Sequence, residues 1–240
     1  LARKALDDIM ADKFAMHTDD FGTWVEPQEV MEHSMDFADA WVDNPEFCIT
    51  GDGRTMSNKT TTYLALRLVR AKNRPLTAPK AAIFPLAIFD SGEKFEFLQK
   101  HSAKLRTMLA NLSKKGFVPQ DSTKGHSLVS PVLWLGGDMK WLLLVTGLST
   151  AQFACVWCTC TKEQRSDWSE FWPLERCNKA SEHGRLRENL FPFIPVERVA
   201  PDFLHLHLRI GERLLHCAAL KLLATAGVEE NADDAERKKQ

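Results

Sequence analysis

A chain of 240 residues with 44% hydrophobic and 26% charged residues has the composition of a folded globular protein, and its length allows one large domain or two small ones. A formal net charge of −1 excludes a globally basic nucleic-acid-binding protein. No apolar run reaches the roughly 20 residues that a membrane-spanning helix needs, and the six cysteines are not arranged like a secreted disulfide framework. We therefore expect an intracellular protein without a membrane partner.

The first 45 residues predict helices. Apolar residues recur with a rough 3.6-residue period over residues 6–14, and a second apolar stripe covers residues 30–41. Pro27 stands near the start of the second helix, where proline is tolerated, and Asn44-Pro45 is expected to end it.

From residue 46 onward, the pattern predicts strands and helices. Strands are expected over residues 46–50, 60–69, 81–89, 129–135 and 153–156, and helices over 93–115, 139–148 and 202–223. Pro85 indicates an edge position or a bulge in the third strand, and Gly51-Asp52-Gly53-Arg54 is expected to turn the chain after the first. Residues 159–200 are polar and irregular. Three strands, a helix and a fourth strand in this order predict an α/β (α+β) protein with an RNase H-like core.

Two aspartates lie at comparable places in this pattern. Asp52 follows the first predicted strand, and Asp138 follows the fourth. In an RNase H-like fold the catalytic carboxylates sit on the first and fourth strands, and carboxylate oxygens are the ligands that Mg²⁺ prefers. The alternative is that both are turn residues beside glycine. Arg54 and Lys140 stand next to the two aspartates, where each can lower a carboxylate pKa or meet a phosphate.

The densest group of thiols is Cys155-Val156-Trp157-Cys158. A C-x-x-C turn presents two thiolates to one zinc ion, but the same spacing occurs in redox motifs and among unrelated core thiols. Candidates for the remaining zinc ligands, nearby in the sequence, are Cys160, Cys177, His183, His205 and His207. The two last histidines do not share a helix face, and Asp202 just before them predicts a helix N-cap.

Several short motifs, taken in order, resemble the catalytic core of the V(D)J recombinase and of its relatives, the Transib-type transposases. They are Gly51-Asp52-Gly53-Arg54-Thr55-Met56-Ser57, Gly137-Asp138-Met139-Lys140, Val145-Thr146-Gly147-Leu148, Cys155-Val156-Trp157-Cys158, Phe193-Ile194-Pro195 and Pro201-Asp202-Phe203-Leu204-His205. The likeness covers roughly residues 46–215. It implies a transposon-derived DNA transposase or recombinase core that acts on phosphodiester bonds by two-metal chemistry.

By this resemblance, Asp52 and Asp138 are the first two catalytic aspartates and bind Mg²⁺ or Mn²⁺, and Cys155 and Cys158 are the thiol half of a structural Cys2His2 zinc site. The third carboxylate, a Glu on a late helix, and the two zinc-binding histidines would lie beyond residue 240. We therefore expect a fragment, and its activity depends on that third carboxylate. Its expected parts are an N-terminal helical segment (1–45), an RNase H-like core (46–158) and a truncated helical, zinc-associated segment (159–240).

The expected partners are DNA and a second copy of the chain, in the nucleus or elsewhere inside the cell. The basic residues on and after the helix over 93–115 are either a solvated face or phosphate contacts; they are Lys100, Lys104, Arg106, Lys114, Lys115 and Lys124. An alternative is a non-catalytic remnant that keeps a zinc site and binds nucleic acid or protein. A further alternative is a purely structural domain stabilised by zinc.

Overall fold

The computed structural model describes residues 14–56, 59–71, 74–75, 83–92, 94–148, 155–161, 163–164, 184–201 and 203–225. The chain divides into two compact units, Leu1–Pro201 and Asp202–Gln240. Among the described residues, the first unit holds every strand, and the second consists of one helix.

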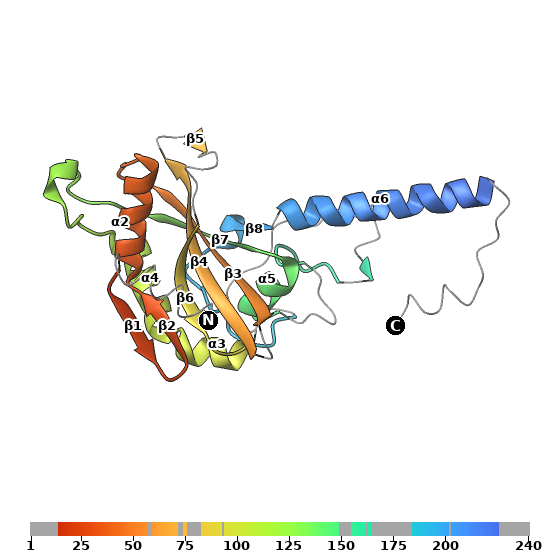
Figure 1. Cartoon of the computed structure of the whole chain (residues 1–240), viewed down its shortest axis with the longest axis horizontal. Helices are drawn as coiled ribbons and strands as arrows, with labels where there is room; N and C mark the ends of the chain where they lie inside the picture. The colour runs from red at the N-terminus through yellow and green to blue at the C-terminus, as the bar shows by residue number, and fades with distance from the viewer. Residues whose placement is uncertain are drawn as a thin grey trace. The chain divides into compact units, whose positions relative to one another are not determined.

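A mixed β-sheet organises the first unit (Figure 1). The strands in the described residues are β1 (Met16–Asp19), β2 (Gly22–Val25), β3 (Glu46–Met56), β4 (Lys59–Ala71), β5 (Arg74–Pro75), β6 (Ile83–Phe89), β7 (Val132–Gly137) and β8 (Val199–Pro201). Their order across the sheet is β1-β2-β6-β4-β3-β7-β8, with β5 beside β4. From β1 across the sheet to β3, each strand pairs antiparallel with the next. Strand β3 pairs in parallel with β7, and β7 pairs in parallel with β8.

The helices are α2 (Pro27–Ala38), α3 (Phe95–His101), α4 (Ala103–Lys115), α5 (Met139–Val145) and α6 (Phe203–Thr225), with short 3-10 turns at Ser122–Lys124 and Val196–Arg198. Helix α2 begins at a proline and ends at Asp39, which adopts a left-handed conformation with φ 48°. It packs against β4, β6 and α4. In the part of the chain that the structure describes, no helix is long and apolar enough to cross a membrane.

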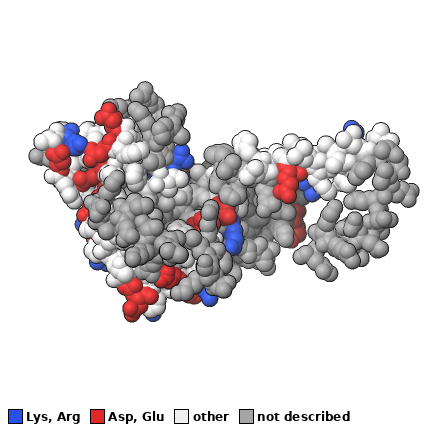
Figure 2. All heavy atoms as spheres, in the orientation of Figure 1, with Lys and Arg blue, Asp and Glu red and all other residues white. Residues whose placement is uncertain are grey.

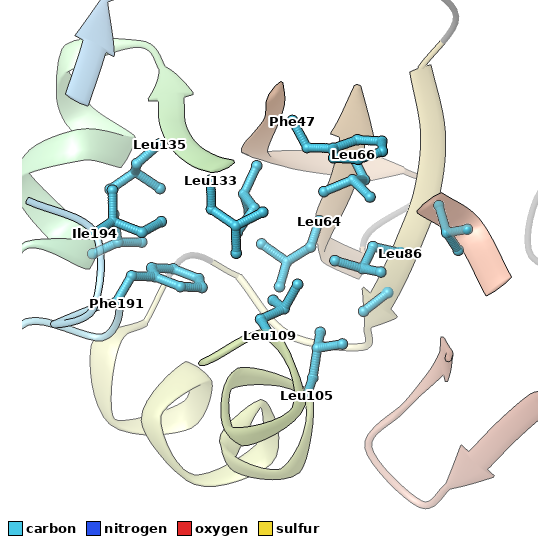
Figure 3. Packing of buried hydrophobic residues seen from close by; sticks show 14 of the residues in the cluster. Phe47, Leu64, Leu66, Leu86, Leu105, Leu109, Leu133, Leu135, Phe191 and Ile194 are labelled. Carbon is cyan, nitrogen blue, oxygen red and sulfur yellow. The ribbon is translucent and has the colours of Figure 1, made fainter. Parts of the chain in front are cut away.

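The core lies on one face of the sheet because alternate residues of the central strands point there (Figure 3). Strands β3, β4 and β7 contribute Phe47, Ile49, Leu64, Leu66, Leu133 and Leu135, all at most 2% exposed. Leu105 and Leu109 of α4, together with Phe191 and Ile194 from the segment before β8, complete this cluster. On these strands, the residues that alternate with the core residues therefore face the opposite side of the sheet.

The predicted mixed α/β class is confirmed, as are the elements with the clearest hydrophobic periodicity. Strand β4, helix α5 and helix α6 cover the predicted segments with ends shifted by a few residues. Pro85 lies at a register irregularity between β4 and β6, which is the predicted bulge.

Several local predictions are wrong. Within the segment expected to be helical, β1 and β2 form a hairpin, because the Asp19 carboxylate accepts the backbone N–H groups of Phe21 and Gly22 and so closes a turn. The chain does not turn at Gly51, since β3 continues to Met56. Residues 155 and 156 of the predicted fifth strand are not in a strand, and residues 153–154 lie outside the described residues. The strand that joins β7 is β8 instead.

The helix predicted over residues 93–115 is interrupted. Ser102 separates α3 from α4 and has φ −94° and ψ 4°, outside the helical range. Its hydroxyl donates to the carbonyl of Leu98 at 2.5 Å. A serine that bonds back to the preceding turn competes with the helical backbone pattern and bends the helix.

Candidate metal centre

The register of two parallel strands brings Asp52 and Asp138 to the same level. In the β3–β7 pair, Thr50 lies beside Gly136, and each aspartate follows its strand partner by two residues. Neighbouring strands are about 4.8 Å apart, and Asp138 is still in an extended conformation, with φ −70° and ψ 165°. The two carboxylates therefore extend from adjacent backbone positions, one within β3 and the other directly after β7.

Asp138 also begins helix α5. Its Oδ1 accepts the backbone N–H of Trp141 at 2.7 Å, which satisfies one of the free amide groups of the first helical turn. The side chain is half-buried. This capping bond fixes the carboxylate against the helix, and the second oxygen, Oδ2, takes no part in it.

The glycine before each aspartate makes room for one aromatic ring. A Cβ added at Gly51 would overlap the six-membered ring of Trp141, and one added at Gly137 would lie 2.5 Å from Trp141 Cδ1. Gly137 also has φ 144°, a conformation that residues with a side chain rarely adopt. Trp141 is 1% exposed, so its indole is packed directly under both strands at the level of these glycines.

Asp52 is exposed, and Tyr63 of β4 lies directly across from it. Together with Cys48 and Thr50, Asp52 points to the face of the sheet opposite the core. Burial raises the pKa of the Cys48 thiol to about 11, and the charge of Arg67 opposes that shift only in part. Cys48 is therefore neutral near pH 7.

Two carboxylates on adjacent strands suit a hard divalent cation such as Mg²⁺ or Mn²⁺. Asp52 is accessible and Asp138 is already fixed by its capping bond, so the donor set agrees with the predicted role. Within the described ranges, no group of three or more histidine, cysteine or acidic residues is arranged to hold a metal ion. Among the described residues, the pair alone therefore offers two of the ligands that such an ion would need.

The C-x-x-C pair lies beside β8. Trp157 Nε1 donates to the carbonyl of Val199 at 2.8 Å, and Val156 is buried in the core cluster, so the turn is attached to the sheet. Cys155 Sγ lies 3.1 Å from Cys158 Sγ and also accepts the N–H of Cys158 at 3.3 Å. Burial and the neighbouring Cys155 raise the pKa of Cys158 to about 11.

These thiols agree with zinc in chemistry, but they have to move apart to bind it. Two sulfurs on a tetrahedral zinc ion with Zn–S bonds of about 2.3 Å are roughly 3.8 Å apart, which is more than the 3.1 Å observed. Cys160 is close in sequence and buried, and its thiol donates to the carbonyl of Thr161 at 3.4 Å.

Most of the other ligands considered from the sequence fall outside what the structure describes. Cys177, His183 and Asp202 lie outside the described residues, as does the side chain of His205. His207 is an exposed residue of α6, in the second unit.

The basic residues on and after α4 are largely engaged within the fold. Lys104 Nζ lies 4.7 Å from the centre of the Trp24 ring, and Lys124 forms an ion pair with Asp36 at 2.5 Å. Arg106 donates to the carbonyls of Leu190 at 3.0 Å and Gln99 at 2.7 Å. These contacts favour structural roles over phosphate contacts, which were one of the two alternatives from the sequence.

No protein-family model matches the chain, and no curated protein matches it. Trp141 is the site residue that sequence reasoning missed, because a tryptophan in an apolar helix gives no sign of what it packs against. The available signal was the Gly-Asp pair that occurs both at Gly51-Asp52 and at Gly137-Asp138.

Proposed function

We propose that the chain is the RNase H-like core of a transposon-derived DNA transposase or recombinase and acts on phosphodiester bonds. The β3–β7 register carries this proposal, since it aligns Asp52 and Asp138 on neighbouring parallel strands. The strand order supports it further. Three antiparallel strands, β3, β4 and β6, are followed by helices α3 and α4 and by β7, which is parallel to β3.

In this proposal Asp52 and Asp138 hold Mg²⁺ or Mn²⁺. When bound, two such ions activate the attacking oxygen and stabilise the leaving oxygen of a phosphodiester. The chain's own contribution is geometric: β3 presents Asp52 to solvent, and the α5 cap holds Asp138. The family's third carboxylate, expected beyond residue 240, would complete the ligand set.

Cys155 and Cys158 are proposed to hold structural zinc with two histidines from further along the chain. Zinc binds thiolates. Because Cys158 has a raised pKa, zinc binding has to displace its proton, so affinity should rise with pH. The bond from Trp157 to β8 would connect this zinc site to the sheet that carries the aspartates.

DNA in the nucleus is the proposed substrate, and a second copy of the chain is the proposed partner. On the face drawn in Figure 2, the described lysines and arginines are scattered among acidic residues. A net charge of −1 agrees with that distribution. DNA contacts would therefore be local, around the metal centre, and less dependent on salt than those of a broadly basic protein.

A nicking assay on supercoiled plasmid with Mn²⁺ tests this function. Wild-type chain, extended downstream to include the expected glutamate, should nick DNA, and Asp52→Ala or Asp138→Ala should abolish nicking. Asp121→Ala is the matched control, since Asp121 is an exposed carboxylate that bonds within its own turn. Equal nicking by all four proteins would contradict the proposal.

The second candidate is a non-catalytic remnant that binds nucleic acid or protein and is stabilised by zinc. It is favoured by the lack, in the described residues, of a third ligand beside the aspartate pair. It predicts DNA or protein binding that is unaffected by Asp52→Ala and no Mn²⁺-dependent nicking even in the extended chain.

A further inference from the structure

Trp141 packs against the two strands next to the aspartates. Its indole lies where a Cβ of Gly51 would be, and the same ring closely approaches Gly137. Its backbone N–H is bonded by the Asp138 carboxylate at 2.7 Å. One residue therefore contacts the backbone just before each aspartate and one aspartate side chain directly.

These contacts determine how the aspartates can move. The ring fills the space beneath β3 and β7, so a displacement of either strand at the level of the glycines requires the ring to move. The capping bond adds a second restraint on Asp138. Since the metal ligands come from separate strands, their mutual spacing depends on what holds those strands at this level.

We propose that Trp141 is a positioning residue that sets the spacing of Asp52 and Asp138 for divalent-cation binding. The inference rests on the proposed function of this pair. Trp141 acts in this way only by packing against the two glycines, and its indole contacts neither metal nor substrate.

The indole N–H makes Trp141→Phe an informative variant. Nε1 of Trp141 is buried and has no hydrogen-bond partner. Replacing the indole with a phenyl ring therefore breaks no side-chain hydrogen bond, and it keeps an aromatic surface under the glycines. Trp141→Ala removes that surface, and Gly51→Ala places a methyl group where the ring now lies.

Calorimetric titration of the purified chain with Mn²⁺, with folding checked by circular dichroism, tests the inference. We expect Trp141→Ala and Gly51→Ala each to weaken Mn²⁺ binding by about tenfold or more, as loss of supporting residues around metal ligands does. Trp141→Phe should retain affinity within about threefold of wild type. Trp24→Ala is the matched control: Trp24 is a buried tryptophan of β2, with β6 and β4 between it and β3, and its loss should leave affinity unchanged.

A second measurement remains informative if Trp141→Ala does not fold. In the double variant Gly51→Ala, Trp141→Leu, the smaller side chain makes room for the added methyl group. Multiplying the fold-losses in Mn²⁺ affinity of Gly51→Ala and Trp141→Leu gives the affinity expected for independent positions. The double variant should bind Mn²⁺ more tightly than that, because the two positions share one contact. Independent, multiplicative effects in this pair would overturn the inference.

Asp52→Ala separates the positioning role of Trp141 from the proposed metal centre itself. If Asp52→Ala weakens Mn²⁺ binding but Gly51→Ala and Trp141→Ala both bind like wild type, the positioning role is wrong and the proposed function stands. If Asp52→Ala itself binds Mn²⁺ like wild type, the proposed metal centre is wrong and the positioning role falls with it.

Discussion

Asp138 has two separable roles, and replacing it with alanine or with asparagine separates them. The carboxylate accepts the N–H of Trp141 at 2.7 Å as the N-cap of α5, and it is a proposed metal ligand. Alanine removes both functions. Asparagine retains an oxygen that can accept the same N–H, but it loses the negative charge that a divalent cation requires.

The expected loss of stability follows from the capping bond. Replacing an Asp N-cap with alanine costs about 1 kcal/mol, whereas asparagine caps a helix about as well as aspartate. In a protein of this size, 240 residues, 1 kcal/mol lowers the melting temperature by about 2–4 °C. Thermal unfolding without metal should therefore show that decrease for Asp138→Ala and almost none for Asp138→Asn.

Titration with Mn²⁺ measures the other role. Both variants should lose binding to a similar extent, although only the alanine variant is destabilised. Asp52→Ala is the companion variant: its carboxylate is exposed on β3, so its removal should abolish metal binding. Equal destabilisation by alanine and asparagine would refute the capping role, and full Mn²⁺ affinity in Asp138→Asn would refute the metal role.

Two further residues lead to measurable predictions. Cys48 has a pKa raised to about 11 by burial, from an ordinary 9.0, so the stability that its neutral thiol contributes is present below pH 9 and is lost as pH rises toward 11. The free energy of unfolding of the wild type should fall by roughly 2 kcal/mol more than that of Cys48→Ala over this interval. In native protein at pH 8, iodoacetamide should modify the exposed Cys217 first and spare Cys48. Arg106→Lys keeps the charge but loses the guanidinium bonds to Leu190 and Gln99, and denaturant unfolding should show a loss of about 1–3 kcal/mol, whereas unchanged stability would show that these bonds contribute nothing.

Hydrophobic periodicity predicted the elements whose pattern is set by one buried face. Strand β4 alternates buried and half-buried residues from Thr62 to Leu68, so its sequence identified it correctly. Strands β1 and β2 are only four residues each, too short for alternation to be detected, and their hairpin depends on the turn at Asp19. β8 is shorter still and forms because β7 offers an edge to pair with.

The candidate residues could be identified from the sequence, but their arrangement could not. Asp52 and Asp138 stood out by type and by the glycine before each. Whether they meet depends on the pairing of Thr50 with Gly136, which is fixed by the packing of the two strands over the core and leaves no local trace in the sequence. For Cys155 and Cys158 the spacing predicted a pair, and the structure adds that the sulfurs are in contact.

The repeated Gly-Asp pair has a different physical origin from the one that the sequence suggested. Beside an aspartate, glycine usually indicates a turn, yet Gly51 lies within β3, in a strand that runs on for five more residues to Met56. Both glycines are needed because the Trp141 ring occupies the space that a side chain would fill. Since only a residue without Cβ allows that approach, the glycines and the tryptophan form one packing unit, and an aspartate follows each of these glycines. A methyl group at Gly51 changes no charge, yet it should impair cation binding as much as Trp141→Ala does, because both disturb this one contact.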